Sequence, residues 1–348
     1  MQKIKFETDY QEGAHPKILE RLLATNLEQT SGYGVDSHCE NAKKLIRKVI
    51  GKPNAEIFFT VGGTQTNTIA IKFFLNPCEG VISVSSGHIN VHESGAIEAT
   101  GHKVITLPHH NGLMDAAELK NYLENFYKNP TWEHMTPPGM VYISFSSEYG
   151  TLYSKEMLTK IKAVCGEYNL KLFIDGARLG AGLMSEACDM NIKDIASLCD
   201  AFYIGGTKNG ALFGEALVFP NPENLNLRLM KTLVKQQGGL LAKGRLLGLQ
   251  FEVLFEENLF FEIARHADIQ AMKIKKAFTE AEIPFLFESF TNQQFPILTK
   301  QQHEKLSSEF DYEIWEPLDD NKTAVRFVTS WATTDDNIEN LIKSVKSL

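Results

Sequence analysis

The sequence contains few cysteines, and those it has are scattered. Five cysteines occur in 348 residues, at positions 39, 78, 165, 188 and 199, without CxxC pairs or histidine-rich ligand spacing. An odd number at such spacing argues against a disulfide framework and against a zinc site. We therefore expect free thiols in a reducing cytoplasm and no bound metal.

Long apolar runs and basic blocks are also missing. No run approaches the roughly 18 apolar residues that a membrane span needs, and the N-terminal MQKIKFETDY has no apolar signal core. The net charge of −8 argues against a nucleic-acid or anionic-membrane surface. There is no Walker loop and no GxGxxG dinucleotide motif. We therefore expect a soluble cytoplasmic protein whose partners are neither nucleic acids nor membranes.

The apolar pattern alternates between strands and helices from residue 55 to 220. It predicts strands at 56–61, 81–85, 103–107, 140–145, 170–175 and 201–205, with helices between them such as 157–168. Residues 211–219 are expected to return as a neighbouring strand. This alternation is typical of an α/β domain with a mostly parallel sheet.

The pattern changes after residue 220. Helical sequence dominates from about 222 to 280 and is interrupted by Gln237-Gly238-Gly239. It is followed by predicted strands near 284–288, 294–298, 311–315 and 324–329, and by a final helix from about 335. Helices are also predicted near 16–26 and 39–50. We expect an N-terminal segment and large α/β domain in residues 1–250, and a small α+β domain in residues 251–348.

Two apolar runs end abruptly in polar groups flanked by glycine. The run 171–174 leads into Asp175 and Arg178, and the run 201–204 leads into a GGTKNG segment that contains Lys208. Short apolar runs bounded by turn formers fit buried parallel strands, and ligands bind beyond the carboxyl ends of such strands. This edge of the sheet is therefore where we expect the chemistry.

Lys208 and Asp175 together indicate pyridoxal phosphate (PLP). A partly desolvated lysine loses proton affinity and can form a Schiff base, although it could instead pair with a carboxylate at the sheet edge. A buried carboxylate such as Asp175 can keep the cofactor's pyridinium nitrogen protonated, although a local pair with Arg178 is the simpler alternative. We interpret the pair as the two ends of a PLP site.

A phosphate site is predicted at Gly63 and Thr64. They follow a strand and open a helix, where free backbone N–H groups and the helix dipole attract an anion. Ordinary N-capping by Thr64 or Thr66 is the alternative.

His88, just beyond the next strand, could stack on a planar cofactor and transfer protons, and Glu93 could orient it. Arg178 and Arg326 are candidates for a substrate carboxylate, because the guanidinium fork matches that group.

Together these residues resemble the threonine aldolase and β-eliminating lyase family of PLP enzymes, which have the aspartate aminotransferase-type fold (fold type I). The resemblance extends over nearly the whole chain, through GAHPKILERL, GGTQTN, SSGHINVHESGA, DGARL, GGTKNG and VRFVTSW. It implies a PLP-dependent carbon–carbon lyase that cleaves threonine or allo-threonine to glycine and acetaldehyde. The same constellation could support β-elimination or transamination of another amino acid.

The resemblance also implies a role for each matching residue. Lys208 would carry the cofactor and Asp175 would contact its ring nitrogen, with Thr207 beside the lysine. The remaining residues would hold the phosphate (Gly63, Thr64), stack on the ring and act as base (His88), and bind the substrate carboxylate (Thr8, Arg178, Arg326). Tyr33, Lys235 and Lys243 would complete the site of an adjoining subunit, which implies a homodimer or homotetramer.

One segment departs from the family pattern. Where typical members carry SLENTH, whose histidine is placed to touch the substrate's β-hydroxyl, this chain has SSEYGT at 146–151. Thr151 stands near the place of that histidine. Its hydroxyl can hydrogen-bond the substrate but cannot take the substrate's proton at neutral pH.

Overall fold

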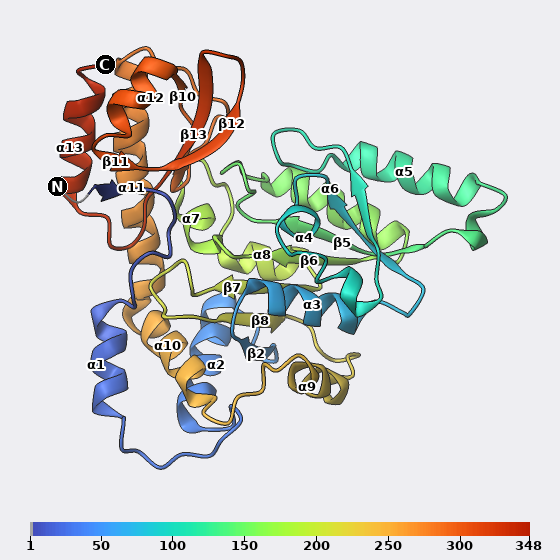
Figure 1. Ribbon diagram of the computed structural model, residues 1–348. Helices are drawn as coiled ribbons and strands as arrows, with labels where there is room; N and C mark the ends of the chain where they lie inside the picture. Colours follow the sequence, from blue (N-terminus) through green and yellow to red (C-terminus); the bar gives the residue numbers. More distant parts are fainter. Residues whose placement is uncertain (1–2) are drawn as a thin grey trace.

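The computed structural model describes residues 3–348 and has a seven-stranded sheet at its centre (Figure 1). The strand order is β2-β8-β7-β6-β5-β3-β4. The strands are β2 (Glu56–Thr60), β3 (Gly80–Val84), β4 (Val104–Leu107), β5 (Pro138–Ser144), β6 (Lys171–Asp175), β7 (Ala201–Gly205) and β8 (Glu215–Phe219). Only β8 runs against the others of this sheet, because it pairs antiparallel with both β2 and β7. The expected mostly parallel sheet is confirmed.

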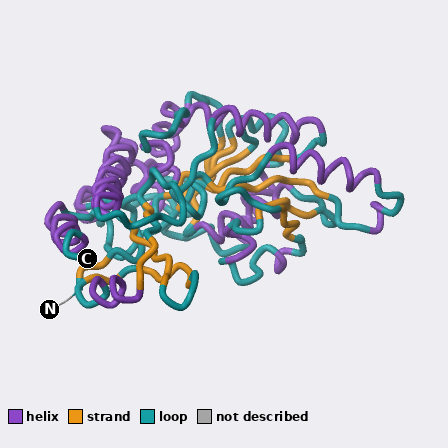
Figure 2. Tube along the Cα trace, turned by 90° about the horizontal axis from the view of Figure 1, so that it is seen from above, coloured by secondary structure: helices purple, strands orange, loops and turns teal. Residues whose placement is uncertain are grey.

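Helices cover both faces of this sheet, as Figure 2 shows from above. Side chains alternate along each strand, so Ile174 and Ile204 enter one apolar core while Phe173 and Tyr203 enter the other. The helices up to residue 255 are α1 (Pro16–Ala24), α2 (Ser37–Ile50), α3 (Gly63–Phe74), α4 (His88–Val91), α5 (Ala116–Lys128), α6 (Lys155–Glu167), α7 (Leu179–Met184), α8 (Ile192–Leu198), α9 (Leu227–Gln236) and α10 (Arg245–Phe255).

A second, smaller sheet lies in the C-terminal part, with the order β10-β13-β12 and with β9 also paired to β13. These strands are β9 (Gln293–Gln294), β10 (Ile297–Thr299), β12 (Glu313–Pro317) and β13 (Lys322–Val328), and the helices beside them are α11 (Leu259–Glu280), α12 (Lys300–Leu306) and α13 (Asp335–Val345). The N-terminal strand β1 (Ile4–Lys5) pairs with β11 (Phe310–Asp311) of this part. The first described residues, at β1, and the C-terminal helix α13 therefore both lie beside the small sheet (Figure 1).

Two sequence predictions need correction. Residues 284–288 do not form a strand: Phe285 makes only an isolated bridge to Pro296. Pro284 and Pro296 have no N–H to donate, so a regular ladder cannot continue there. The helical stretch from 222 to 280 is interrupted after α9 at Gln237-Gly238-Gly239, as predicted, but it is also broken at Glu256–Asn258, between α10 and α11, where no break was predicted.

The structure also gives the state of the cysteines and the character of the helices. All five cysteines are free thiols, three of them buried. Within residues 3–348, none of the helices has the length and apolar character to cross a membrane.

Candidate active site

A cavity of about 330 Å³ opens at the carboxyl edge of the central sheet, beyond β2, β5, β6 and β7. Among the residues that line it are all seven that the sequence assigned to a cofactor: Gly63, Thr64, His88, Asp175, Arg178, Thr207 and Lys208. Residues far apart in the sequence thus meet here because neighbouring parallel strands end at the same edge.

Two glycines allow the ends of β6 and β7 to lie unusually close. A Cβ atom on Gly176 would be 1.9 Å from the carbonyl oxygen of Tyr203, and one on Gly205 would be 2.4 Å from that of Ala177. The backbones are joined there by a hydrogen bond from Gly205 N to Gly176 O of 3.0 Å. The glycines beside Asp175 and Lys208 therefore bring the two strand ends together.

Asp175 is buried at the cavity wall and accepts four hydrogen bonds. Its Oδ1 accepts from the Tyr203 hydroxyl (2.5 Å) and from Ala177 N (3.0 Å). Its Oδ2 accepts from the Tyr142 hydroxyl (2.6 Å) and from Asn67 Nδ2 (3.0 Å). Four donors around one carboxyl group fix its orientation at the cavity wall. The alternative of a local pair between Asp175 and Arg178 is not seen.

His88 is linked to Asp175 through a short polar chain. Its Nδ1 lies 2.8 Å from Glu93 Oε1, which confirms the suggestion that Glu93 orients the ring. Asn67 Nδ2 donates to both Glu93 and Asp175. Burial lowers the pKa of His88, but the hydrogen bond to Glu93 and the charge of Asp175 outweigh it, so the pKa is raised above its usual value.

Lys208 is partly buried, and this lowers its pKa. Removal from water is the main cause and the neighbouring positive charge of Arg178 adds to it, so that the pKa falls to about 8. A lysine with this pKa has a substantial neutral fraction near neutral pH and can act as a nucleophile. Beneath it, burial raises the pKa of Glu215 to about 8, although Gly206 N and the Thr207 hydroxyl both donate to that carboxyl group.

Helix α3 points an uncapped N-terminus into the cavity. Its N-cap is Gly62, which has no side chain to accept from the first-turn N–H groups. The Thr66 hydroxyl instead bonds back to Gly62 O (2.9 Å) and lies 2.6 Å from the Thr60 hydroxyl. The alternative of threonine N-capping is therefore wrong, and the N–H groups around Gly63 and Thr64 remain available to an anion.

Arg178 already has a carboxylate partner, which the sequence reasoning missed. Its Nε and Nη2 donate to the two oxygens of Asp9, at 2.7 and 3.0 Å. Asn292 Nδ2 also donates to Asp9 Oδ2 (2.9 Å), and Asp9 itself is buried. Asp9 precedes the first predicted helix in a segment without a clear pattern, so no periodicity could have pointed to it.

Three predicted substrate-binding residues do not line this cavity. Arg326 on β13 is held by Gln293 Oε1 (2.9 Å) and by Glu313, although its pKa is lowered by burial and by the charge of Arg178. The Thr8 hydroxyl is buried and has no hydrogen-bond partner. The Thr151 hydroxyl donates to Asn111 O (2.7 Å) and lies 2.5 Å from the Ser147 hydroxyl, so it faces a neighbouring loop.

Other cavity residues escaped the sequence reasoning as well. These are Tyr10, Ser146, Glu148, Tyr203 and Glu215. Glu148 Oε1 accepts from His88 N (2.9 Å) and from the Ser144 hydroxyl (2.7 Å). The only sequence feature that pointed to Glu148 was its position in SSEYGT, the segment that differs from the family's SLENTH pattern. Residues 3–348 contain no cluster of three or more His, Cys, Asp or Glu side chains placed to hold a metal ion.

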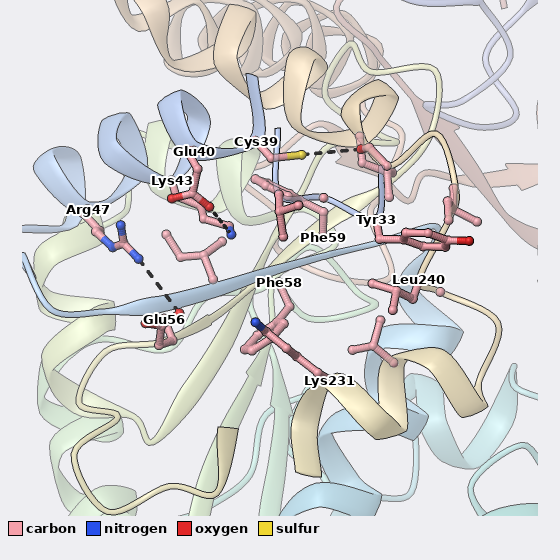
Figure 3. A pocket seen from close by; sticks show the side chains of 18 residues that line it. Tyr33, Cys39, Glu40, Lys43, Arg47, Glu56, Phe58, Phe59, Lys231 and Leu240 are labelled. Carbon is pink, nitrogen blue, oxygen red and sulfur yellow. Dashed lines mark hydrogen bonds and ion pairs between the residues drawn. The ribbon is translucent and has the colours of Figure 1, made fainter. Parts of the chain in front are cut away.

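A second cavity, of about 420 Å³, lies along the free edge of β2, between α2 and α9 (Figure 3). Tyr33 lies at one end of it, with Lys235 Nζ 5.3 Å from the centre of the ring. Arg47 and Glu56 lie at the other end (Figure 3). Tyr33 is therefore not part of the Lys208 cavity of its own chain.

Comparison with known proteins agrees with this geometry. The sequence profile of the beta-eliminating lyase family matches residues 5–301. The low specificity L-threonine aldolase of a Pseudomonas species is 26% identical over 100% of this chain and 98% of its own length. The solved structure of Leishmania major threonine aldolase has a TM-score of 0.93 and 43% identity, with 99% of each chain covered.

A more distant solved structure supports the fold alone. An aspartate aminotransferase variant of Thermus thermophilus has a TM-score of 0.71 at 14% identity, covering 99% of this chain and 92% of that one. The expected fold type I architecture is thereby confirmed. The family match covers well over half of the chain, and so this chain is a member of the beta-eliminating lyase family.

Proposed function

We propose that this protein is a PLP-dependent lyase that cleaves threonine or allo-threonine to glycine and acetaldehyde. The observation that carries the proposal is one cavity in which Lys208, Asp175 and the uncapped N-terminus of α3 all meet. The similarity to two threonine aldolases over the full chain supports the choice of substrate.

The residues of the cavity fit the proposed cofactor. The amine of Lys208 is the group for the aldehyde carbon, the carboxylate of Asp175 for the ring nitrogen, and the N–H groups near Gly63 and Thr64 for the phosphate. Ser146 Oγ and Glu148 Oε2 are buried on the cavity wall without a hydrogen-bond partner, which is expected where a polar ligand supplies the missing contacts. Bound there, PLP would draw electrons from the substrate's α-carbon and so allow a bond at that carbon to break.

The chain's own residues would orient the substrate. Arg178 presents a guanidinium beside Lys208, and we infer that it binds the substrate's carboxylate. Asp9 holds two donors of this guanidinium and so fixes the plane in which the remaining N–H groups point. Arg326 and Thr8 would join this contact if the small domain moves toward the cavity.

His88 would handle the proton of the substrate's hydroxyl. Its Nδ1 is engaged by Glu93, which leaves Nε2 as the atom able to accept a proton in the cavity. Glu148 accepts from the backbone N–H of His88 and so holds the start of α4 in place. Thr151 faces Asn111, so we infer that His88 is the principal base in this chain.

We further infer a homodimer or homotetramer with shared active sites. Tyr33 is 52% exposed and lies outside the cavity of its own chain, which supports a role for it beside the cavity of a second copy. We infer that Lys235 and Lys243 likewise contribute to the active site of the second copy.

Product analysis tests the proposed reaction. With PLP added, we expect L-threonine to yield glycine and acetaldehyde in equal amounts. Lys208→Ala should lose at least about a thousandfold in kcat, because the nucleophile is removed. Lys160→Ala changes an exposed lysine of α6 that pairs only with Glu156, and it is the matched control.

Other outcomes would contradict the proposal. Ammonia together with a keto acid would show β-elimination or transamination instead. If the protein stays colourless after PLP is added, the proposal that it binds PLP is contradicted as well.

A further inference from the structure

A third cavity, of about 380 Å³, lies outside the active site and is lined by residues of α11 and of the end of α7. Figure 1 shows the positions of these two helices. Its walls are formed by Met184, Glu186, Arg265, Asp268, Ile269, Met272, Lys273, Lys276 and Phe290. It shares no lining residue with the Lys208 cavity. A volume of this order accommodates a small organic molecule.

Asp268 is a buried acid without a side-chain partner. The residue is 4% exposed, and no side chain in the described part of the chain donates a hydrogen bond to either carboxyl oxygen. Burial raises its pKa to about 9, although the backbone N–H of Asn292 acts in the opposite direction. Leaving a carboxyl group in this state costs stability, so it is expected where a ligand satisfies the group.

Arg265 lies on the same face of α11, one turn before Asp268, and it also lacks an acidic partner. Its Nη2 contacts only Met184 Sδ, at 3.6 Å. The other two cations of this cavity are neutralised, Lys273 by Asp335 (2.6 Å) and Lys276 by Glu280 (3.8 Å). The exposed acid Glu186 also lacks an ion-pair partner, so among the described residues the cavity has one free cation and two free acids, of which only Asp268 is buried. The Cβ atoms of Arg265 and Asp268 are about 5–6 Å apart, as expected for positions i and i+3.

Between and around these two groups the wall is apolar. Met184, Ile269, Met272 and Phe290 supply it, and Ile269 and Phe290 are 50% and 39% exposed. Methionine side chains adapt readily to ligands of different shape. The cavity therefore combines an inner acid, a free guanidinium and an adaptable apolar surface.

We propose that this cavity binds a free α-amino acid with an apolar side chain. The ammonium group would pair with Asp268, the carboxylate with Arg265, and the side chain would pack against the methionines and Ile269. The two charged groups of an α-amino acid are attached to one carbon, which matches a cation and an acid one helical turn apart. The substrate proposed for the active site has a polar side chain, so this is a site for a different ligand.

Binding should be accompanied by the release of a proton. Without a ligand the buried carboxyl group of Asp268 keeps its proton at neutral pH. The incoming ammonium group stabilises the carboxylate, and the displaced proton passes to the solvent. The ligand keeps its own charge, so about one proton is released for each molecule bound at pH 7.

Calorimetric titration of the PLP-loaded protein with L-leucine tests the proposal. We expect saturable binding with about one proton released, measured from the difference between two buffers of unlike ionisation enthalpy. Asp268→Asn should weaken binding at least about tenfold and abolish the proton release, and Arg265→Gln should weaken it by a similar factor. Lys276→Gln, on the same cavity wall, is the matched control and should bind normally.

Ligand analogues and the variants' stability complete the test. n-Pentylamine lacks the carboxylate and 4-methylpentanoate lacks the ammonium group, so each should bind about tenfold more weakly than L-leucine. Because no side chain donates to Asp268 and asparagine has nearly the same volume, Asp268→Asn should keep the Tm of the parent protein.

Several results would overturn the proposal. The first is the absence of binding heat at about 10 mM L-leucine. The second is binding that Asp268→Asn leaves unchanged, which would place the ligand in the active site. The third is dissociation of the oligomer by Ile269→Glu without L-leucine binding, which would show that a second copy of the chain covers the cavity.

Discussion

At the scale of single residues, two cations share one small cavity. Lys208 and Arg178 both line it, and the charge of Arg178 helps to lower the pKa of Lys208. Asp9 opposes this effect, because its carboxylate pairs with Arg178 and also raises the pKa of Lys208. The burial of Asp9 and the short distances of the pair keep its influence strong.

The first prediction in this cavity concerns Asp9→Asn. The change removes a negative charge that stabilises the protonated amine, so the pKa of Lys208 should fall below about 8. The rate at which the apoprotein takes up PLP should depend on the neutral amine. In a plot of the PLP uptake rate against pH, the midpoint for Asp9→Asn is therefore expected at lower pH than the midpoint for the parent protein. An unchanged midpoint would mean that the Asp9 charge does not reach Lys208.

The main candidate active-site residues were predictable from the sequence, whereas the residues that form hydrogen bonds with them were not. Asp175, Lys208, His88 and Gly63 stand out because each lies at the end of a strand or a few residues beyond it, in a glycine-rich setting. The partners reach the cavity from other segments by tertiary packing: Tyr142 lies inside β5 and resembles any core aromatic residue. Thr151 could be placed in the sequence, but the direction of its hydroxyl depends on the Asn111 loop.

At the scale of elements, a buried histidine joins α2 to α10. His38 Nδ1 lies 2.6 Å from Glu252 Oε2, and its Nε2 lies 2.9 Å from Glu28 Oε2. Both ring nitrogens must donate to carboxylates, which requires the imidazolium form. Burial lowers the pKa of His38, but Glu252 and then Glu28 outweigh it and raise the pKa. Asn41 and Arg21 also face Glu252, at 2.9 and 3.9 Å.

His38→Gln should therefore destabilise the protein in a pH-dependent way. A group whose pKa is raised by folding contributes its full stability below the pKa of the unfolded chain, and loses it as pH rises through the folded pKa. We expect a loss of about 2 kcal/mol in unfolding free energy near pH 6. The loss should shrink above neutral pH, as measured by urea unfolding of both proteins across the pH range. A loss that grows with pH would contradict the imidazolium assignment.

Most elements of the large domain could be predicted because their patterns are strong. The buried strands are short apolar runs bounded by glycine, and the helices carry apolar residues at helical spacing. The small domain was harder, since β9, β11 and the bridge at Phe285 are too short to carry a period. The pairing of β1 with β11 joins residues some 300 positions apart, which no local pattern encodes.

At the scale of the whole molecule, Phe6 fastens the N-terminal segment to the small domain. Its N–H donates to Asp311 O (2.7 Å), and its carbonyl accepts from Val328 N (2.8 Å). The ring is buried against Phe310 and Phe327. Three residues later the same segment places Asp9 beside Arg178, so the small domain and the active site are mechanically connected.

Phe6→Ala should consequently affect the site as well as stability. Phe278→Ala is the matched control, because Phe278 is equally buried in the same core but is not joined to Asp9 by a short segment. Each change is expected to cost about 3–5 kcal/mol in unfolding free energy. Below the unfolding transition, only Phe6→Ala should shift the pH midpoint of PLP uptake. Equal shifts of the PLP uptake midpoint in both variants would show that the N-terminal segment has no special influence on the active site.

The pairing of β1 with β11 also bears on how the protein is made. The segment that holds Asp9 leaves the ribosome about 300 residues before its partner strand at Phe310–Asp311 is synthesised. Domains otherwise tend to fold as units while the chain grows. A nascent chain can thus complete the central sheet and bring Lys208 to its edge before Asp9 is held in place. The charge balance of the site is therefore set only after residues 310–311 have been synthesised, about 300 residues after the segment that carries Asp9.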